Sequence, residues 1–182
     1  MTSNNLIVRD ATERYRKARR EEGESRGAFD TEIRRLGGTP RVETVVRRGP
    51  APSDVASILG IASTDETVIR ARHMYDGQKV VQLADSYIPL DVAEAAGIES
   101  PDPGRGGIIS RMAEAGFKQT EGIEEVVQYA ATAAEAEAFG VDVGTLLLQI
   151  THTGYTQDGR AVEVTVHRPS PGWVLRFNAP LV

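Results

Sequence analysis

Residues 68–89, VIRARHMYDGQKVVQLADSYIP, carry the clearest secondary-structure signals in this chain. They contain two strand-like runs that meet at Asp76-Gly77, a dipeptide that favours a tight β-hairpin turn. Arg70 and Arg72 are two positions apart in the first run, and side chains with this spacing project from the same face of a strand. The stretch therefore predicts a hairpin that carries two cations side by side on one face of a sheet.

The chain repeats this pattern once. A short helix ending at Gly60 precedes the first hairpin, and a short helix ending at Gly140 precedes a second hairpin that turns at Asp158-Gly159. The residues after the two turns, GQKVVQ and GRAVEV, are also alike. Two helix-hairpin units of this kind predict a pseudo-symmetric, largely antiparallel sheet with flanking helices, which is an α+β fold.

Glycine and proline residues divide the rest of the chain into short elements. A polar, mostly exposed helix is expected over residues 10–22, which are rich in Ala, Arg and Glu and contain no strong helix breaker. Further helices are expected at 28–36, 53–59, 90–96, 108–115 and 131–139, and strands at 41–48, 66–74, 79–88, 120–130, 145–155, 160–168 and 173–177.

The composition excludes several classes of protein. The 182 residues are enough for one domain, with or without an N-terminal extension, and contain no cysteine, which is typical of a reducing cytosol. The three histidines, His73, His152 and His167, have no metal-ligand spacing, and no apolar run is long enough to cross a membrane. We therefore expect a cytoplasmic protein that uses no metal or cofactor and has no membrane partner.

Charge is distributed unevenly. Residues 1–50 hold 12 Lys and Arg against 8 Asp and Glu, whereas residues 51–182 hold 9 against 18, a balance of −9. An acidic body is a poor candidate for binding nucleic acid, which requires clustered positive charge. The basic residues of 9–20 are interpreted as a solvated helix face with internal salt bridges, and a tether beside DNA is the alternative.

Three motifs in this order resemble the UTRA domain. They are the RxR strand with its Asp-Gly turn and SYIP, the segment GRGGIISRMAEAGF at 104–117, and DGRAVEV at 158–164. The UTRA domain is the effector-binding half of GntR-type transcription regulators of the HutC subfamily, and the resemblance covers residues 28–177. It implies a chorismate-lyase-like fold, a homodimer, and a small-molecule pocket that controls operator binding.

The resemblance also suggests a domain division. Family members carry a winged helix-turn-helix before this domain, and only about 27 residues precede the match here. We expect residues 1–27 to be an N-terminal extension with an inter-domain linker helix, and residues 28–182 to be the UTRA-like ligand-binding domain. Operator DNA would then be reached only through a DNA-binding domain that is missing from this chain.

The candidate binding residues begin with Arg70 and Arg72. If their face lines a pocket, two guanidinium groups can hold a phosphate or carboxylate, and the alternative is an exposed strand face. Gly107 and Ile108 begin a helix after a glycine-rich loop, where unpaired backbone N–H groups favour an anion, and Ser110 lies in the first turn. In the family, the loop that enters this helix lines the pocket.

The resemblance adds three further candidates. Glu163 follows the second Asp-Gly turn, where family glutamates bind ligand hydroxyl or amide groups, and its alternative is a surface carboxylate. Tyr87 belongs to the Ser-Tyr pair of the first hairpin, and Arg168 ends the last strand of the second hairpin. Trp173 is expected to be a packing anchor.

One departure concerns the ligand. Sugar-phosphate-responsive members carry a glutamate two residues before the Ser-Tyr pair, and this chain has Ala84 there, with Asp85 one step later and therefore on the other face. The expected ligand is a small anionic metabolite, and an aminosugar phosphate is not favoured.

The sequence is compatible with two other functions. A chorismate-lyase-like enzyme acting on a small aromatic carboxylate would need Glu163 or His73 as its acid or base, and His73 projects away from Arg72. A purely structural dimerisation module would have no deep polar pocket. The sequence therefore favours a ligand-sensing domain that is not an enzyme.

Overall fold

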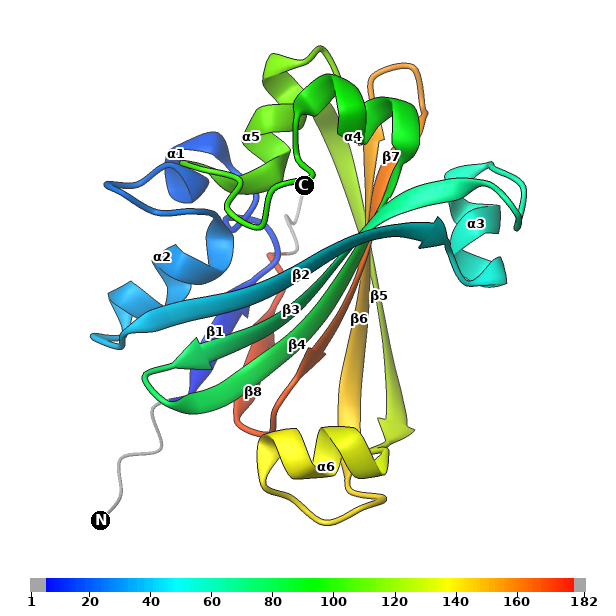
Figure 1. Cartoon of the computed structure of the whole chain (residues 1–182). Helices are drawn as coiled ribbons and strands as arrows, with labels where there is room; N and C mark the ends of the chain where they lie inside the picture. Colours follow the sequence, from blue (N-terminus) through cyan, green and yellow to red (C-terminus); the bar gives the residue numbers. More distant parts are fainter. Residues whose placement is uncertain (1–5, 179–182) are drawn as a thin grey trace.

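The computed structural model describes residues 6–178 as a sheet with helices on both faces (Figure 1). The helices are α1 (Lys17–Arg20), α2 (Ala28–Arg35), α3 (Ser53–Leu59), α4 (Leu90–Ala96), α5 (Gly107–Glu114) and α6 (Ala133–Phe139). The strands are β1 (Ile7–Asp10), β2 (Pro40–Pro50), β3 (Glu66–Asp76), β4 (Lys79–Pro89), β5 (Gln119–Ala130), β6 (Leu146–Thr156), β7 (Ala161–Pro169) and β8 (Trp173–Arg176).

Six strands form one antiparallel sheet in the order β2-β3-β4-β7-β6-β5, which confirms the α+β prediction. The strands β2-β3-β4 and β5-β6-β7 lie in the same arrangement on the two sides of the central β4–β7 pair. The helix α3 comes before β3 in the chain, just as α6 comes before β6. Both hairpins also contain a one-residue register shift, between Met74 and Tyr75 in the first and between Gly154 and Tyr155 in the second. The two helix-hairpin units therefore share a β-bulge as well as a topology.

The helices divide between the two faces of the sheet. The helices α4 and α5 cover one face at one end, and Val92 and Met112 are fully buried there against Val68 and Ile88. The helices α1 and α2 lie on this same side (Figure 1). The opposite face is covered by α3 and α6, which pack in separate apolar clusters around Leu59 and Phe139.

The prediction of a helix over residues 10–22 is wrong. The chain instead forms β1, which pairs in parallel with β8, then turns and enters the four-residue α1. Arg9, Arg14 and Arg20, expected on an exposed face, are 1%, 6% and 6% exposed. Contacts made by this N-terminal segment (residues 7–20) with the sheet outweigh its weak local preference for helix.

Trp173 is a packing anchor, as expected. Its side chain packs against the cluster of Ile7, Phe29 and Ile33, and its indole N–H donates to the carbonyl oxygen of Val81 at 2.9 Å. This contact ties β8, and β1 beside it, to the central strand β4 of the large sheet. Between residues 6 and 178, none of the helices is both long and apolar enough to cross a membrane.

Candidate ligand-binding site

One row of paired residues crosses all six strands on the face covered by α1, α2, α4 and α5. The pairing connects, in order, Val46, Arg70, Ser86, Thr165, His152 and Glu124. Directly paired residues of an antiparallel sheet project to the same side, so the row places charged and polar groups at the centre of this face. A second row on the same face contains Thr44, Arg72, Ala84 and His167, each two positions away from the first-row residue of its strand.

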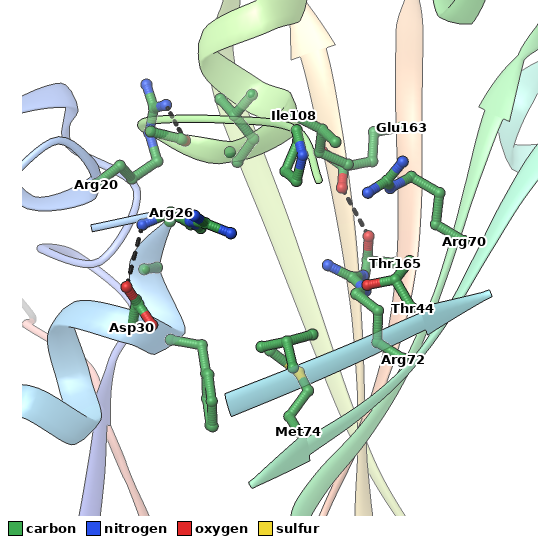
Figure 2. Close-up of a pocket in the computed structure, with 18 of the residues that line it drawn as sticks. Arg20, Arg26, Asp30, Thr44, Arg70, Arg72, Met74, Ile108, Glu163 and Thr165 are labelled. Carbon is green, nitrogen blue, oxygen red and sulfur yellow. Dashed lines mark hydrogen bonds between the residues drawn. The ribbon is translucent and has the colours of Figure 1, made fainter. Parts of the chain in front are cut away.

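A cavity of about 290 Å³ lies between these rows and the elements that cover them (Figure 2). Its sheet side contains Arg70, Arg72, His152, Glu163, Thr165 and His167, and its other walls contain Arg14, Tyr15, Arg20, Arg26, Asp102, Gly107 and Ile108. The predicted residues Arg70, Arg72, Gly107, Ile108 and Glu163 are therefore brought together around one cavity.

Arg70 is buried, and its guanidinium group holds a loop. Nη1 donates to the carbonyl oxygens of Ile98 and Ser100, the latter at 2.6 Å, and Nη2 donates to that of Pro101 at 2.8 Å. Burial, followed by the charge of nearby Arg72, lowers the pKa of Arg70 to about 10. Arg70 therefore fixes the loop that forms one wall of the cavity and adds positive charge behind it.

Arg72 has more of its hydrogen-bonding capacity free. Its Nη2 donates to the hydroxyl of Ser86, and its buried Nε has no hydrogen-bond partner. Burial lowers its pKa, and the charge of Glu163 opposes that effect. The guanidinium group of Arg72 is thus the better placed of the two to bind an anion.

Glu163 is held in position by neutral donors. Its Oε1 accepts from the Thr165 hydroxyl at 2.7 Å, and its Oε2 accepts from the side-chain amide of Gln119 at 2.9 Å. The side chain is 4% exposed and lines the cavity, so it is not the surface carboxylate of the alternative interpretation. Its charge attracts the arginines without forming a direct ion pair with them.

The glycine-rich loop approaches the cavity closely. Gly106 and Gly107 have φ of +77° and +73°, a left-handed conformation that side chains disfavour. A Cβ on Gly106 would overlap the Ser110 hydroxyl and lie 2.7 Å from Cγ of Glu21. The loop thereby directs the first turn of α5, with its unpaired N–H groups, at the cavity beside Ile108.

Ser110 supports this wall from behind. It is buried, its hydroxyl accepts from Nη1 of Arg20, and it donates to the Glu21 carboxylate at 2.7 Å. Arg20 also donates to the backbone oxygens of Gly106 and Tyr15, at 3.2 Å and 3.0 Å. The predicted serine therefore joins the N-terminal segment to α5 and does not line the cavity.

Tyr87 and Arg168 lie outside the cavity, contrary to the sequence-based assignment. The bulge in the first hairpin pairs Arg70 with Ser86, so Tyr87 projects from the opposite face, where it packs with the α3 cluster. Arg168 forms ion pairs with Asp85 and Glu135 on that same face. Asp85 is thus on the other side of the sheet from Arg72, as its spacing from Ala84 predicted.

His73 is also on the outer face. It is exposed and pairs with Leu83 rather than with a cavity residue. Joint action with Arg72, which the lyase alternative would use, does not fit this geometry. Across residues 6–178, no group of three or more His, Asp or Glu side chains is arranged to hold a metal ion.

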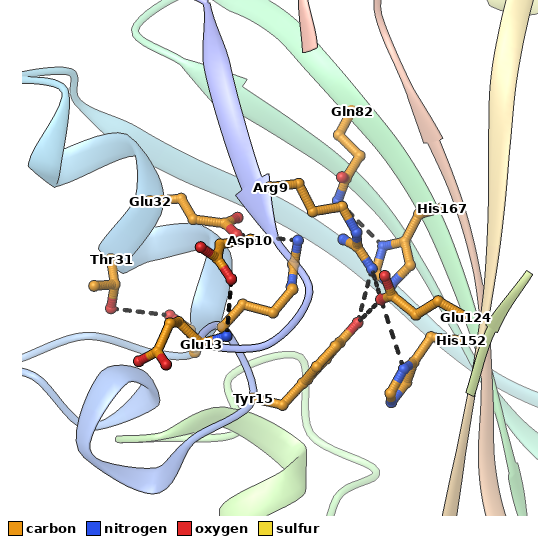
Figure 3. Close-up of polar contacts among 12 residues, drawn as sticks. Arg9, Asp10, Glu13, Tyr15, Thr31, Glu32, Gln82, Glu124, His152 and His167 are labelled. Atoms are coloured by element: carbon orange, nitrogen blue, oxygen red, sulfur yellow. Dashed lines mark hydrogen bonds and ion pairs between the residues drawn. The ribbon is translucent and has the colours of Figure 1, made fainter. Parts of the chain in front are cut away.

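Sequence reasoning missed the N-terminal wall of the cavity (Figure 3). The Tyr15 hydroxyl donates to Glu124 at 2.6 Å and accepts from Nη2 of Arg9, which also pairs with Glu124. The Tyr15 ring stacks on His152, and Arg14 pairs with Glu32 at 3.1 Å. These partners are distant in sequence, and no local pattern marks them.

Burial keeps the two cavity histidines neutral. It lowers the pKa of His152 to about 4, with Glu163 and Glu124 opposing the effect. His167 has its pKa lowered well below the usual value, first by burial and then by the charges of Arg9 and Arg14. The positive charge of the cavity therefore comes from arginines alone.

The comparisons with known proteins identify the family. The family model described as the UTRA domain matches residues 35–169. The HTH-type transcriptional regulator Rv0792c of Mycobacterium tuberculosis is 29% identical over 140 residues, which are 73% of this chain and 50% of that protein. An HTH-type regulator of Streptomyces coelicolor, SCO4628, is 28% identical over 74% of this chain and 52% of its own length. The chain thus spans about half the length of these curated relatives.

Solved structures share the fold. PhnF from Mycobacterium smegmatis superposes with a TM-score of 0.76 at 16% identity, over 97% of this chain and 73% of that one. The separately solved effector domain of PhnF gives a TM-score of 0.71 at 14% identity, over 84% of this chain and 94% of its own length. Identities this low show the fold alone. The match over residues 35–169 leads to one conclusion: this chain belongs to the UTRA domain family.

Proposed function

We propose that this chain is the effector-binding domain of a HutC-type regulator and that its effector is a small anionic metabolite. The observation that carries the proposal is the charge of the cavity. Its lining contains five arginines and three carboxylates, namely Arg14, Arg20, Arg26, Arg70 and Arg72 against Asp30, Asp102 and Glu163, a surplus of two positive charges (5 − 3). A site with this surplus selects negatively charged ligands.

Two features would hold the anion. Arg72 offers guanidinium donors that no group within residues 6–178 accepts, and charge-assisted hydrogen bonds of this kind are the stronger class. The first turn of α5 offers backbone N–H groups beside Ile108 and the positive end of the helix dipole. Glu163, on the same side of the cavity as Arg72, would accept from a hydroxyl or amide group of the ligand.

We further propose that ligand binding controls operator affinity through a separate winged-helix unit. The −9 balance of residues 51–182 argues against DNA binding by this body itself. A homodimer would match the symmetry of an operator. Each edge strand offers an exposed apolar side chain for such a contact: Val45 on β2 and Val127 on β5 are 65% and 53% exposed on the sheet face opposite the cavity. Light scattering that shows a mass of only 19.7 kDa at micromolar concentration would contradict the dimer.

The binding proposal is tested by thermal unfolding with inorganic phosphate, sugar phosphates and small carboxylates. A ligand that binds the folded state raises the Tm, so at least one of these anions should stabilise the protein beyond potassium chloride of equal ionic strength. Arg72→Ala should lower the affinity for that anion by about tenfold to a hundredfold, since a hydrogen bond to a charged group contributes ~1.5–3 kcal/mol.

Arg47→Ala is the matched control for this test. Arg47 is exposed and pairs with Ile69 on the face away from the cavity, so its loss should leave the Tm shift unchanged. If no anion shifts the Tm, or if Arg72→Ala responds like Arg47→Ala, the proposed site is wrong.

A further inference from the structure

Three guanidinium groups at the cavity form no direct ion pair. Arg20 and Arg70 are 6% and 1% exposed, Arg72 is partly buried, and none of the three has a carboxylate within 4.0 Å among residues 6–178. Their protein partners are neutral oxygens of hydroxyl and carbonyl groups. Burying a charge without an opposite charge is costly, so uncompensated arginines are expected where a ligand supplies the counter-ion.

The other charges around the cavity cancel in pairs. Arg14 pairs with Glu32 at 3.1 Å, Arg26 with Asp102 at 2.9 Å, and Arg34 with Asp30 at 3.5 Å. Glu21, which approaches Arg20 through the Ser110 hydroxyl, pairs with Lys17 at 4.0 Å. The charge left over is that of the three unpaired arginines and of Glu163, a net charge of +2 (3 − 1). A ligand with a single negative charge would leave one of these positive charges uncompensated.

The unpaired arginines lie on two sides of the cavity. Figure 2 shows Arg20 on the wall formed by the N-terminal segment and Arg70 and Arg72 across from it on the sheet. The apolar side chains of Met74 and Ile108 line the space between these walls. A ligand that fills the cavity therefore meets positive charge at each end and an apolar middle.

We propose that the ligand is a small molecule with two acidic groups, one bound at Arg72 in front of Arg70 and the other bound at Arg20. This inference rests on the proposed anion-binding function and adds the number and placement of the acidic groups. It also makes Arg20, which precedes the family-matched residues 35–169, a ligand-binding and specificity-determining residue. The Nη2 of Arg20 has no protein acceptor among residues 6–178, which leaves it available for the second group.

The test compares pairs of probes that differ in one acidic group. Adipate is paired with hexanoate, and 3-phosphoglycerate is paired with glycerol 3-phosphate. In the wild type, the two-acid member of at least one pair should bind about tenfold or more tightly than its one-acid mate, as measured by Tm shift and titration calorimetry. Arg20→Ala should remove the preference for the two-acid probe, whereas Arg72→Ala should weaken the binding of both probes of the pair.

Two control variants separate ligand contact from support of the fold. Arg16→Ala removes an arginine of the N-terminal segment whose side chain is 63% exposed and pairs with Glu13, so the preference should persist. Thr31→Ala removes the hydroxyl that donates to the backbone oxygen of Arg19 at 2.7 Å and leaves every cavity-lining side chain in place, so the preference should also persist even if the Tm falls.

The outcomes distinguish this inference from the function on which it rests. Equal binding of the two members of both pairs, or a preference that survives Arg20→Ala, overturns the two-acid ligand and leaves the anion site intact. Failure of every probe to bind, relative to potassium chloride, overturns both proposals.

Discussion

The Tyr15 ring lies on the imidazole of His152, with ring centroids 4.0 Å apart and planes inclined by 16° (Figure 3). This stack closes one end of the cavity and buries both nitrogens of His152 without a hydrogen-bond partner. Tyr15, which precedes the family-matched residues 35–169, thus determines the environment of His152 on strand β6.

Stability should fall in mild acid because of His152. Its pKa is about 4 in the folded protein, whereas an unfolded chain has a histidine pKa of about 6.5. Between these values only the unfolded chain takes up the proton, so the free energy of unfolding should decrease as the pH falls through this window, by about 2 kcal/mol at pH 5. Above pH 7 both states are neutral and the contribution is absent.

Urea denaturation at several pH values between 7.5 and 5 measures this slope. His152→Gln cannot take up the proton and should show a shallower dependence, with the remainder due to His167, whose pKa is shifted in the same direction. An unchanged slope in the variant would show that His152 does not titrate as its burial predicts.

Gly106→Ala should destabilise the protein more than other substitutions of left-handed glycines. Gly97 has φ of +62° with no atom within 4 Å of an added Cβ, so Gly97→Ala reports the backbone cost alone, about 1 kcal/mol. Gly106→Ala adds the collision with Ser110 and Glu21 and should cost more, as well as weaken anion binding. Equal Tm losses for the two variants would show that the loop moves aside freely.

Arg168→Ala should reduce stability and leave ligand binding intact. The substitution breaks partly buried ion pairs with Asp85 and Glu135 on the face away from the cavity and should lower the free energy of unfolding by about 1 kcal/mol. The Tm shift caused by an anion should equal that of the wild type. A variant that unfolds normally but loses the shift would place Arg168 in the ligand site after all.

Tyr15→Phe should loosen the N-terminal segment. It removes the hydroxyl that joins Arg9 to Glu124, so backbone amides of residues 11–20 should exchange with deuterium about fivefold faster. Tyr129→Phe is the control, since it also removes a tyrosine–glutamate hydrogen bond, to Glu135, in another part of the sheet. Equal exchange of residues 11–20 in the two variants would mean that the Arg9–Tyr15–Glu124 contact does not hold the segment.

The parts of the fold that follow local rules could be predicted from the sequence. Asp76-Gly77 and Asp158-Gly159 mark both hairpin turns, and Gly60, Gly97 and Gly140 end their helices in the left-handed conformation. These signals lie within a few residues of the structure that they specify, so neither the ends of these helices nor the positions of the hairpin turns required knowledge of distant contacts.

The candidate site could be predicted only in part. The spacing of Arg70 and Arg72 showed that they share a face, but the face taken by Tyr87 depends on the bulge. The turn alone pairs Asp76 with Lys79 and would pair Arg70 with Asp85, which places Tyr87 on the arginine face, and the extra residue shifts the pair to Arg70 and Ser86.

The N-terminal wall of the cavity could not be predicted for another reason. Tyr15 meets Glu124 across 109 positions and Arg20 meets Ser110 across 90. Isolated from these partners, the segment has the composition of an exposed helix. The burial of its arginines depends on partners that the folded sheet, α2 and α5 supply.

The pairing of β1 with β8 also sets an order of events during synthesis. Ile7 is paired with Trp173, 166 positions later (173 − 7), so the strand that receives the N-terminal segment leaves the ribosome long after the segment itself. The six-stranded sheet can assemble from its two hairpins before β8 is synthesised, and β1 has no partner strand during this time. Closure of the N-terminal wall of the cavity is therefore a late step of folding. A nascent chain halted before residue 173 would lack the wall that Tyr15 and Arg20 contribute, whereas the loop held by Arg70 would already be complete.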